Sequence, residues 1–422
     1  MQVSVENTHN LGRRITITIP AENIKNLVKI KLSQLAQKVR IDGFRQGKVP
    51  LEIVAKRYGM SILHEVLTDL MQQKVMTVIN KNNLVPVGKL NYIPGEYKEG
   101  SDFTYVIEFE IYPEIKLKEF DSIQVKKPLV ELNEIDVDNM LLELGRQQGV
   151  WKEVIRPVKV GDRVTIEITN LENDENESDK INQLIWIIGQ ESMFFDLEKK
   201  IIGHNPGDNF IVESIFTEGD EKPITNFYIQ LKKIEECQIP EMNEQLIKNL
   251  GEPEGSIIKL RDEIRKTMEQ ELKHTVNNFI KLQVFHGLLS SNQVEVPISL
   301  LESELKNFSQ QSSIKQQIKL FPRRLLEKKA KNRVSLGLLL NEVIRINKLQ
   351  VEEQRLQQLI KSLEITSCKK FSNNDEIMKS IKNSVLEDMA VELIMKQCVI
   401  TEQKMPFQDL RRMIVEYEQC FI

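Results

Sequence analysis

The chain has 422 residues, of which 41% are apolar and 28% charged, and its 58 basic and 62 acidic side chains give a formal net charge of −4. This length exceeds what one hydrophobic core supports and predicts roughly three domains of about 150 residues each. The near balance of charge excludes nucleic-acid binding through overall charge, so any such contact must come from a local basic patch. No window approaches the roughly 20 apolar residues that span a bilayer, and the first residues contain no apolar core of signal-peptide length. We therefore expect a cytoplasmic protein without membrane contact.

The cysteines and glycines argue against metal and nucleotide chemistry. Four cysteines are spread along the chain without CxxC spacing, which indicates neither a zinc site nor a disulfide framework. No phosphate-binding loop of the GxxxxGK[ST] type is present, so the sequence predicts no ATPase cycle. We expect no metal and no cofactor.

The first 112 residues predict a domain of mixed α+β type. Alternating polar and apolar residues predict strands at 14–19 and 105–111, and apolar residues at three- and four-residue steps predict a helix over 21–40. Two glycines and a proline then break the helical period, which predicts a loop over 41–50. A second helix is expected from about residue 51 into the eighties.

The remaining chain predicts a linker and two further domains. Residues 113–150 are interpreted as the linker, with an extended segment at 123–128 and a helix near 133–148. Short strands recur between 151 and 238 and predict a small β-rich domain. Long amphipathic runs over 239–422 predict a mostly α-helical C-terminal domain. These helical runs are broken near 251–255, at Pro297, at Pro322 and around 372–375. The fold class is therefore multi-domain α+β.

The loop over 41–50 is the most specific candidate for a binding site. Phe44 stands between glycines and cations where little local structure could bury it, and Arg45 and Lys48 supply donors for acidic or phosphate-rich surfaces. Residues 21–60 carry nine basic and three acidic side chains, so this segment is net +6. Residue chemistry alone leaves two interpretations open: an exposed docking knob, or a Phe44 that folds back onto its own domain beside a solvated cationic face.

The run from Lys38 to Pro50, KVRIDGFRQGKVP, resembles the ribosome-binding signature of the bacterial trigger factor family. Further runs resemble later parts of that family's first domain, at 92–97 and 103–105, and its arm-forming helices, at 296–304 and 330–345. The resemblance extends essentially from end to end. It implies an N-terminal ribosome-binding domain, a β-rich middle domain and a helical C-terminal chaperone domain with arms.

The resemblance also implies partners and site residues. It assigns ribosome binding to Gly43, Phe44, Arg45, Gln46, Gly47 and Lys48. The implied partners are the large ribosomal subunit at the nascent-chain tunnel exit, nearby ribosomal RNA phosphates, and nascent unfolded polypeptides. The family usually carries a third cation where this chain has Gln46, which predicts weaker docking. A homodimer away from the ribosome is compatible with the resemblance, and the sequence leaves the oligomeric state open.

The β-rich region resembles FK506-binding prolyl isomerases, through VGDRV at 160–164 and the glycine turns that follow. Such domains use no nucleophile, because an apolar pocket favours the twisted amide and lowers the barrier of roughly 18 to 20 kcal/mol. The candidate pocket residues are Trp186, Ile188, Met193, Phe194, Leu197 and Phe227. Asp196 and Leu197 replace the glycine and aromatic of the family, and the loop at 217–226 is short, which predicts a degenerate pocket. The same residues could instead be ordinary core.

Three functions of different class remain open. The first is an ATP-independent ribosome-associated chaperone whose long helices leave apolar faces for unfolded chains. The second is an active peptidyl-prolyl cis-trans isomerase with folding assistance as its main role. The third is an RNA-binding protein, disfavoured because no stacking aromatics accompany the cations. Side chains that serve either client binding or the core are Met268, Phe321, Leu325, Leu338, Met378, Met389 and Met395. The resemblance favours the chaperone.

Overall fold

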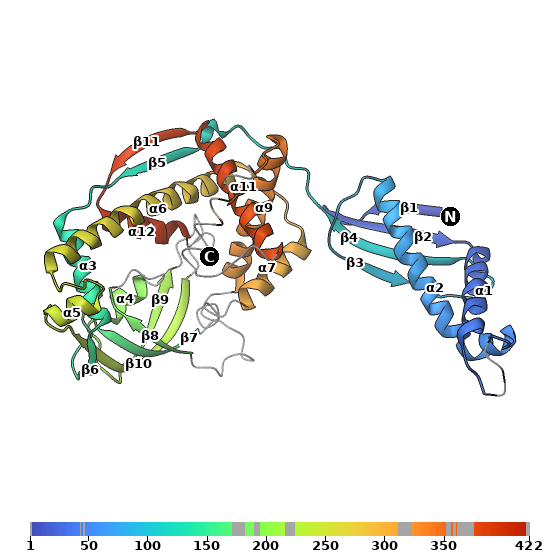
Figure 1. Ribbon diagram of the computed structural model, residues 1–422, viewed down its shortest axis with the longest axis horizontal. Coiled ribbons are helices and arrows are strands. Elements are labelled where there is room, and N and C mark those ends of the chain that lie inside the picture. The colour runs from blue at the N-terminus through green and yellow to red at the C-terminus, as the bar shows by residue number, and fades with distance from the viewer. Residues whose placement is uncertain are drawn as a thin grey trace. The chain divides into compact units, whose positions relative to one another are not determined.

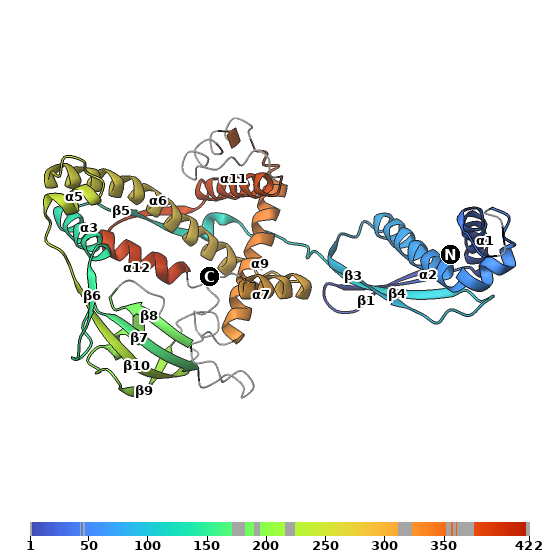
Figure 2. The same ribbon diagram turned by 60° about the horizontal axis from the view of Figure 1, so that its bottom comes forward.

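The protein is described by a computed structural model that covers residues 2–42, 44, 47–170, 182–189, 195–215, 224–310, 323–351, 356, 357, 360 and 375–418. The chain divides into two compact units, which Figures 1 and 2 show as ribbons from two directions. The N-terminal unit contains residues 1–114 and 294–303. The C-terminal unit contains residues 115–293 and 304–422.

The N-terminal unit is an antiparallel sheet with two helices packed on one face (Figure 1). Its elements are β1 (Gln2–Asn7), β2 (Gly12–Ile19), α1 (Ala21–Lys38), α2 (Leu51–Lys81), β3 (Pro86–Pro94) and β4 (Phe103–Ile111), and the strand order is β1-β2-β4-β3. Alternate residues of the central strands are buried, as the strand period requires, and Ile17 pairs with Tyr105. Residues of α2 at four-residue steps, Val66 and Leu70 among them, pack against this face. The predicted strands and helices of this region are confirmed.

Residues 294–303 return to the N-terminal unit, a connection that helical periodicity does not reveal. They include the start of α7 (Ile298–Gln310). Gly88 of β3 permits the close approach of this segment, because its φ is +71° and a Cβ added there would lie 2.9 Å from the Cβ of Ser299.

The β-rich part of the C-terminal unit is a five-stranded sheet with one short helix against it. Its elements are β6 (Val150–Glu153), β7 (Arg163–Asn170), β8 (Asn182–Ile187), α4 (Phe195–Ile201), β9 (Asn209–Ile215) and β10 (Ile224–Gln238). The strand order is β6-β10-β7-β8, and β9 also pairs with β10. Buried aliphatic residues of β7 and β10, such as Ile166 and Leu231, pack with Leu197 and Ile201 of α4. This core positions the predicted isomerase residues.

The rest of the C-terminal unit is mostly helical, as predicted. Its elements are η1 (Phe120–Ser122), β5 (Gln124–Leu129), α3 (Glu134–Gln147), α5 (Glu244–Asn249), α6 (Ile257–Ser291), the end of α7, α9 (Arg323–Ile346), α11 (Asp375–Met395), β11 (Val399–Lys404) and α12 (Phe407–Glu418). None of the described helices is both long and apolar enough to cross a bilayer.

The segment 113–150, predicted as a linker, contributes folded elements to the helical region. Val137 of α3 shares a buried cluster with Leu260 and Ile264 of α6. β5 pairs in parallel with β11, a strand that the helical pattern beyond Pro240 did not predict. Contacts with residues more than a hundred positions away in the sequence therefore hold this segment in place.

Candidate functional site

The loop between α1 and α2 is fixed at its base by buried apolar side chains. Ile41 and Val49 are 9% and 6% exposed and pack with Ala36 of α1 and Val54 of α2 in a small cluster. Phe44 lies between them in sequence yet is 40% exposed, with its N–H donating to the carbonyl of Ile41 at 3.1 Å. Core packing therefore stops at the base of the loop and leaves the Phe44 ring accessible.

Three of the six predicted ribosome-binding residues lie in the described part of the loop. These are Phe44, Gly47 and Lys48, whereas Gly43, Arg45 and Gln46 lie outside the described residues. Gly47 has a φ of +79°, a conformation that glycine adopts without steric cost. Lys48 is exposed and forms no ion pair with any residue that the structure describes.

The basic surface around the loop is smaller than the residue count implies. Lys31 of α1 lies 2.8 Å from the carboxylate of Glu65 and 2.6 Å from that of Asp69, both on α2. The hydrogen bond to Asp69, followed by that to Glu65, raises the pKa of Lys31 above its ordinary value. This ammonium therefore joins the two helices. Lys25 and Lys29 are exposed and lack an ion pair within the described parts of the chain, so their charge is available to a partner.

The described candidates for an isomerase pocket belong to the core of the β-rich region. Ile188 and Leu197 are each 1% exposed and Phe227 is fully buried, all in one hydrophobic cluster. Trp186 is half-buried and packs against that cluster. Met193 and Phe194 lie outside the described residues.

Two client-binding candidates of the helical region also contribute to cores. Leu325 of α9 is 5% exposed within the β-rich cluster, and Met268 of α6 is 2% exposed in the cluster shared with α3. The remaining candidates are Leu338, which is buried, Met378, Met389 and Met395, which are half-buried, and Phe321, which lies outside the described residues. Leu325 brings α9 against the region that carries the isomerase candidates.

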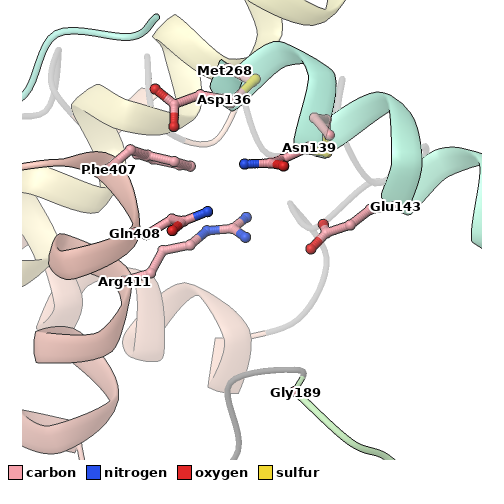
Figure 3. A pocket seen from close by; sticks show the side chains of 9 residues that line it. Asp136, Asn139, Glu143, Gly189, Met268, Phe407, Gln408 and Arg411 are labelled. Atoms are coloured by element: carbon pink, nitrogen blue, oxygen red, sulfur yellow. The ribbon is translucent and has the colours of Figure 1, made fainter. Parts of the chain in front are cut away.

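A polar cavity of about 450 Å³ lies among α3, α6 and α12 (Figure 3). Figure 3 shows Asn139 and Glu143 extending from α3 toward Gln408 and Arg411 of α12. These side chains offer both donors and acceptors of hydrogen bonds. The described residues contain no group of three or more side chains placed to hold a metal. None of the four isomerase candidates that the structure describes lines this cavity, and its polar residues come from helices too far apart in sequence for spacing to reveal it.

Two models of one protein family match this chain. The model described as "Bacterial trigger factor protein (TF)" matches residues 1–144, and the one described as "Bacterial trigger factor protein (TF) C-terminus" matches residues 256–400. Together the two ranges cover more than half of the chain and flank the β-rich region. A solved structure described as "Promiscuous Substrate Recognition in Folding and Assembly Activities of the Trigger Factor Chaperone" is 16% identical, covers 94% of this chain and 100% of its own, and has a TM-score of 0.49.

Proposed function

Because this chain belongs to the bacterial trigger factor family, we propose that it is a cytoplasmic chaperone that docks on the ribosome and holds nascent polypeptides open without ATP. The docking element is the loop at 43–50, and its target is the large subunit at the tunnel exit. The observation that carries this proposal is the exposed ring of Phe44 above the buried anchors Ile41 and Val49. An apolar side chain presented on a fixed base and flanked by cations has the character of an interface hot spot.

Co-sedimentation with ribosomes tests the docking proposal. The variant Phe44→Ala/Arg45→Ala/Lys48→Ala is compared with wild type and with Met76→Ala/Lys81→Ala/Lys89→Ala. The control removes one exposed apolar side chain and two exposed cations of the N-terminal unit that lie outside the loop. We expect the loop variant to bind at least about tenfold more weakly and the control to stay within about twofold of wild type. Equal sedimentation of the loop variant and wild type would refute docking through this loop.

Contacts to ribosomal RNA phosphates form the second part of the docking proposal. The exposed ammonium groups of Lys25 and Lys29 support it. Each phosphate contact releases counterions, so binding should weaken as salt rises, and Lys25→Ala/Lys29→Ala should flatten that dependence. A salt dependence identical to that of wild type would contradict these contacts.

The prolyl isomerase activity of the chain is proposed to be weak. Burial of Ile188, Leu197 and Phe227 in the sheet core supports this, since a side chain that fills a core does not contact a substrate proline. Refolding of a proline-limited protein provides the test, with the same chaperone assayed for suppression of aggregation. We expect suppression of aggregation with little acceleration of refolding. Strong acceleration without suppression would favour the alternative function, an active isomerase.

A further inference from the structure

The sheet formed by β5 and β11 has a defined hydrogen-bond phase. The N–H of Val399 donates to the carbonyl of Ile123 at 3.1 Å, and the N–H of Met405 donates to the carbonyl of Leu129 at 3.2 Å. Successive residues of a strand point their backbone groups to opposite sides. The odd-numbered residues of β11 therefore bond to β5, and the even-numbered residues direct their N–H and C=O groups away from it.

The edge of β5 that faces away from β11 is closed by α6. The side-chain amide of Gln283, 5% exposed, accepts from the N–H of Lys126 at 2.8 Å and donates to the carbonyl of Lys126 at 2.9 Å. Pro128 is the next residue of β5 that faces this side, and it has no N–H. This side is unfavourable for a third strand, because both backbone groups of Lys126 are already bonded and Pro128 has no N–H.

The edge of β11 that faces away from β5 has backbone groups without partners among the described residues. Ile400, Glu402 and Lys404 direct three N–H and three C=O groups outward, and these groups bond to none of the described residues. All six side chains of β11 are exposed. Figure 1 shows β11 on the side of β5 away from α6, so the helix that closes one edge leaves the other accessible. Such a row of alternating donors and acceptors matches the backbone of one further extended strand.

We propose that the open edge of β11 binds an extended segment of an unfolded polypeptide by β-strand addition. The inference deepens the proposed chaperone function and rests on it, because that function supplies unfolded chains. Recognition through backbone groups tolerates many sequences. The exposed aliphatic side chains of Val399 and Ile400 favour apolar β-branched neighbours, and the carboxylate of Glu402 is paired with Lys127 at 3.4 Å.

A synthetic strand tests the proposal on the full-length wild-type chain. The peptide alternates Val and Thr and ends in Lys. Two matched peptides of the same sequence carry N-methyl groups on alternate residues, one peptide along each edge of the strand. We expect the unmethylated peptide to slow amide hydrogen exchange at Ile400, Glu402 and Lys404 at least about tenfold, and not at the residues already bonded to β5. Methylation of the docking edge should abolish binding. The proposal is overturned if the methylated peptides bind as well as the unmethylated peptide, or if only amides other than those of Ile400, Glu402 and Lys404 are protected.

A pair of variants at one position separates backbone from side-chain effects. Glu402→Pro removes an outward N–H from an edge strand that tolerates proline, whereas Glu402→Ala keeps it and removes the same carboxylate. We expect about tenfold weaker peptide binding for the proline variant and a change within about twofold for the alanine variant. Equal affinities overturn the proposal, as does peptide-independent self-association of the wild type through β11. Ribosome docking and suppression of aggregation are measured in parallel, so failure here is distinguishable from failure of the chaperone function.

Discussion

The carboxylate of Glu110 accepts hydrogen bonds from Ser299 in the first turn of α7. It accepts hydrogen bonds from the Ser299 hydroxyl at 2.6 Å, from the Ser299 N–H at 2.8 Å and from the Ile298 N–H at 3.0 Å. Partial burial would raise the pKa of Glu110, but these bonds outweigh it and lower the pKa below its ordinary value. A charged acceptor thus fixes residues 294–303 to the sheet of the N-terminal unit.

Glu110→Gln should loosen this attachment. The neutral amide keeps one acceptor but loses the charge, and we expect a loss of about 1 to 2 kcal/mol at pH 7 and faster amide exchange at Ile298 and Ser299. Because the folded pKa is lowered, the wild-type contribution is complete above the ordinary value of 4.5 and disappears as pH falls through the lowered value. Exchange rates measured from pH 7 to pH 3 should converge for variant and wild type. Glu99→Gln, at an exposed position, serves as the control, and an effect of similar size there would contradict this assignment.

Arg163 is expected to stabilise the β-rich region through Glu235. The two side chains lie 2.8 Å apart, and the hydrogen bond from Arg163, followed by that from Lys233, lowers the pKa of Glu235. Arg163→Met leaves a carboxylate that is only 11% exposed with one partner fewer, so we expect a loss of about 1 to 3 kcal/mol at pH 7. The part of the loss that comes from Glu235 should vanish below the lowered pKa, where the carboxyl group is protonated. Urea unfolding followed by tryptophan fluorescence measures it.

The tryptophans make this measurement specific, because the chain has two, Trp151 and Trp186, and both lie in the β-rich region. Lys233→Met is the matched control. Lys233 is 39% exposed, so its ion pair with Glu235 should contribute less to stability than the pair of Arg163 with Glu235. Equal losses for the two variants would show that the Arg163 contact has no special weight.

Local patterns predicted most of the helices and strands because their burial is periodic. The alternation of Ile15, Ile17 and Ile19 against the sheet core and the four-residue steps of α2 are examples. β11 lacks such a signal, since its six side chains are all exposed and its stability comes from pairing with β5, far away in sequence. The return of residues 294–303 to the N-terminal unit is equally non-local.

The candidate loop was visible in sequence for a different reason. Glycines and cations around Phe44 interrupt the helical period, and that interruption needs no tertiary information. The pairing of Lys31 with Glu65 and Asp69 could not be predicted, because it depends on which faces of α1 and α2 meet. The open edge of β11 likewise depends on knowing its partner strand and the position of Gln283.

Leu325→Ala should destabilise the β-rich region although Leu325 belongs to α9. The side chain is 5% exposed in a cluster with residues of β7 and β10. Truncation leaves a cavity, and we expect a loss of about 2 to 4 kcal/mol in unfolding followed by tryptophan fluorescence. Ile346→Ala, on the same helix but 52% exposed, should change stability by less than about 0.5 kcal/mol. A neutral Leu325→Ala would mean that α9 does not contribute to this core in solution.

Gln283 offers the last test, because its side-chain amide bonds both backbone groups of Lys126 at the edge of β5. Gln283→Leu keeps an apolar body of similar size but leaves the N–H and C=O of Lys126 without their partner. Two unsatisfied backbone groups should cost about 2 to 4 kcal/mol, and the Lys126 amide should exchange faster while the amides of Val399 and Met405 stay protected longer. Gln283→Glu separates donor from acceptor: its carboxylate still accepts from the Lys126 N–H but repels the carbonyl, so we expect the amide to remain protected despite lower stability.

Exposure of the Lys126 edge in the leucine variant should also create a second place for a strand to add. Peptide binding that is unchanged in stoichiometry would show that Pro128 alone is enough to block that edge.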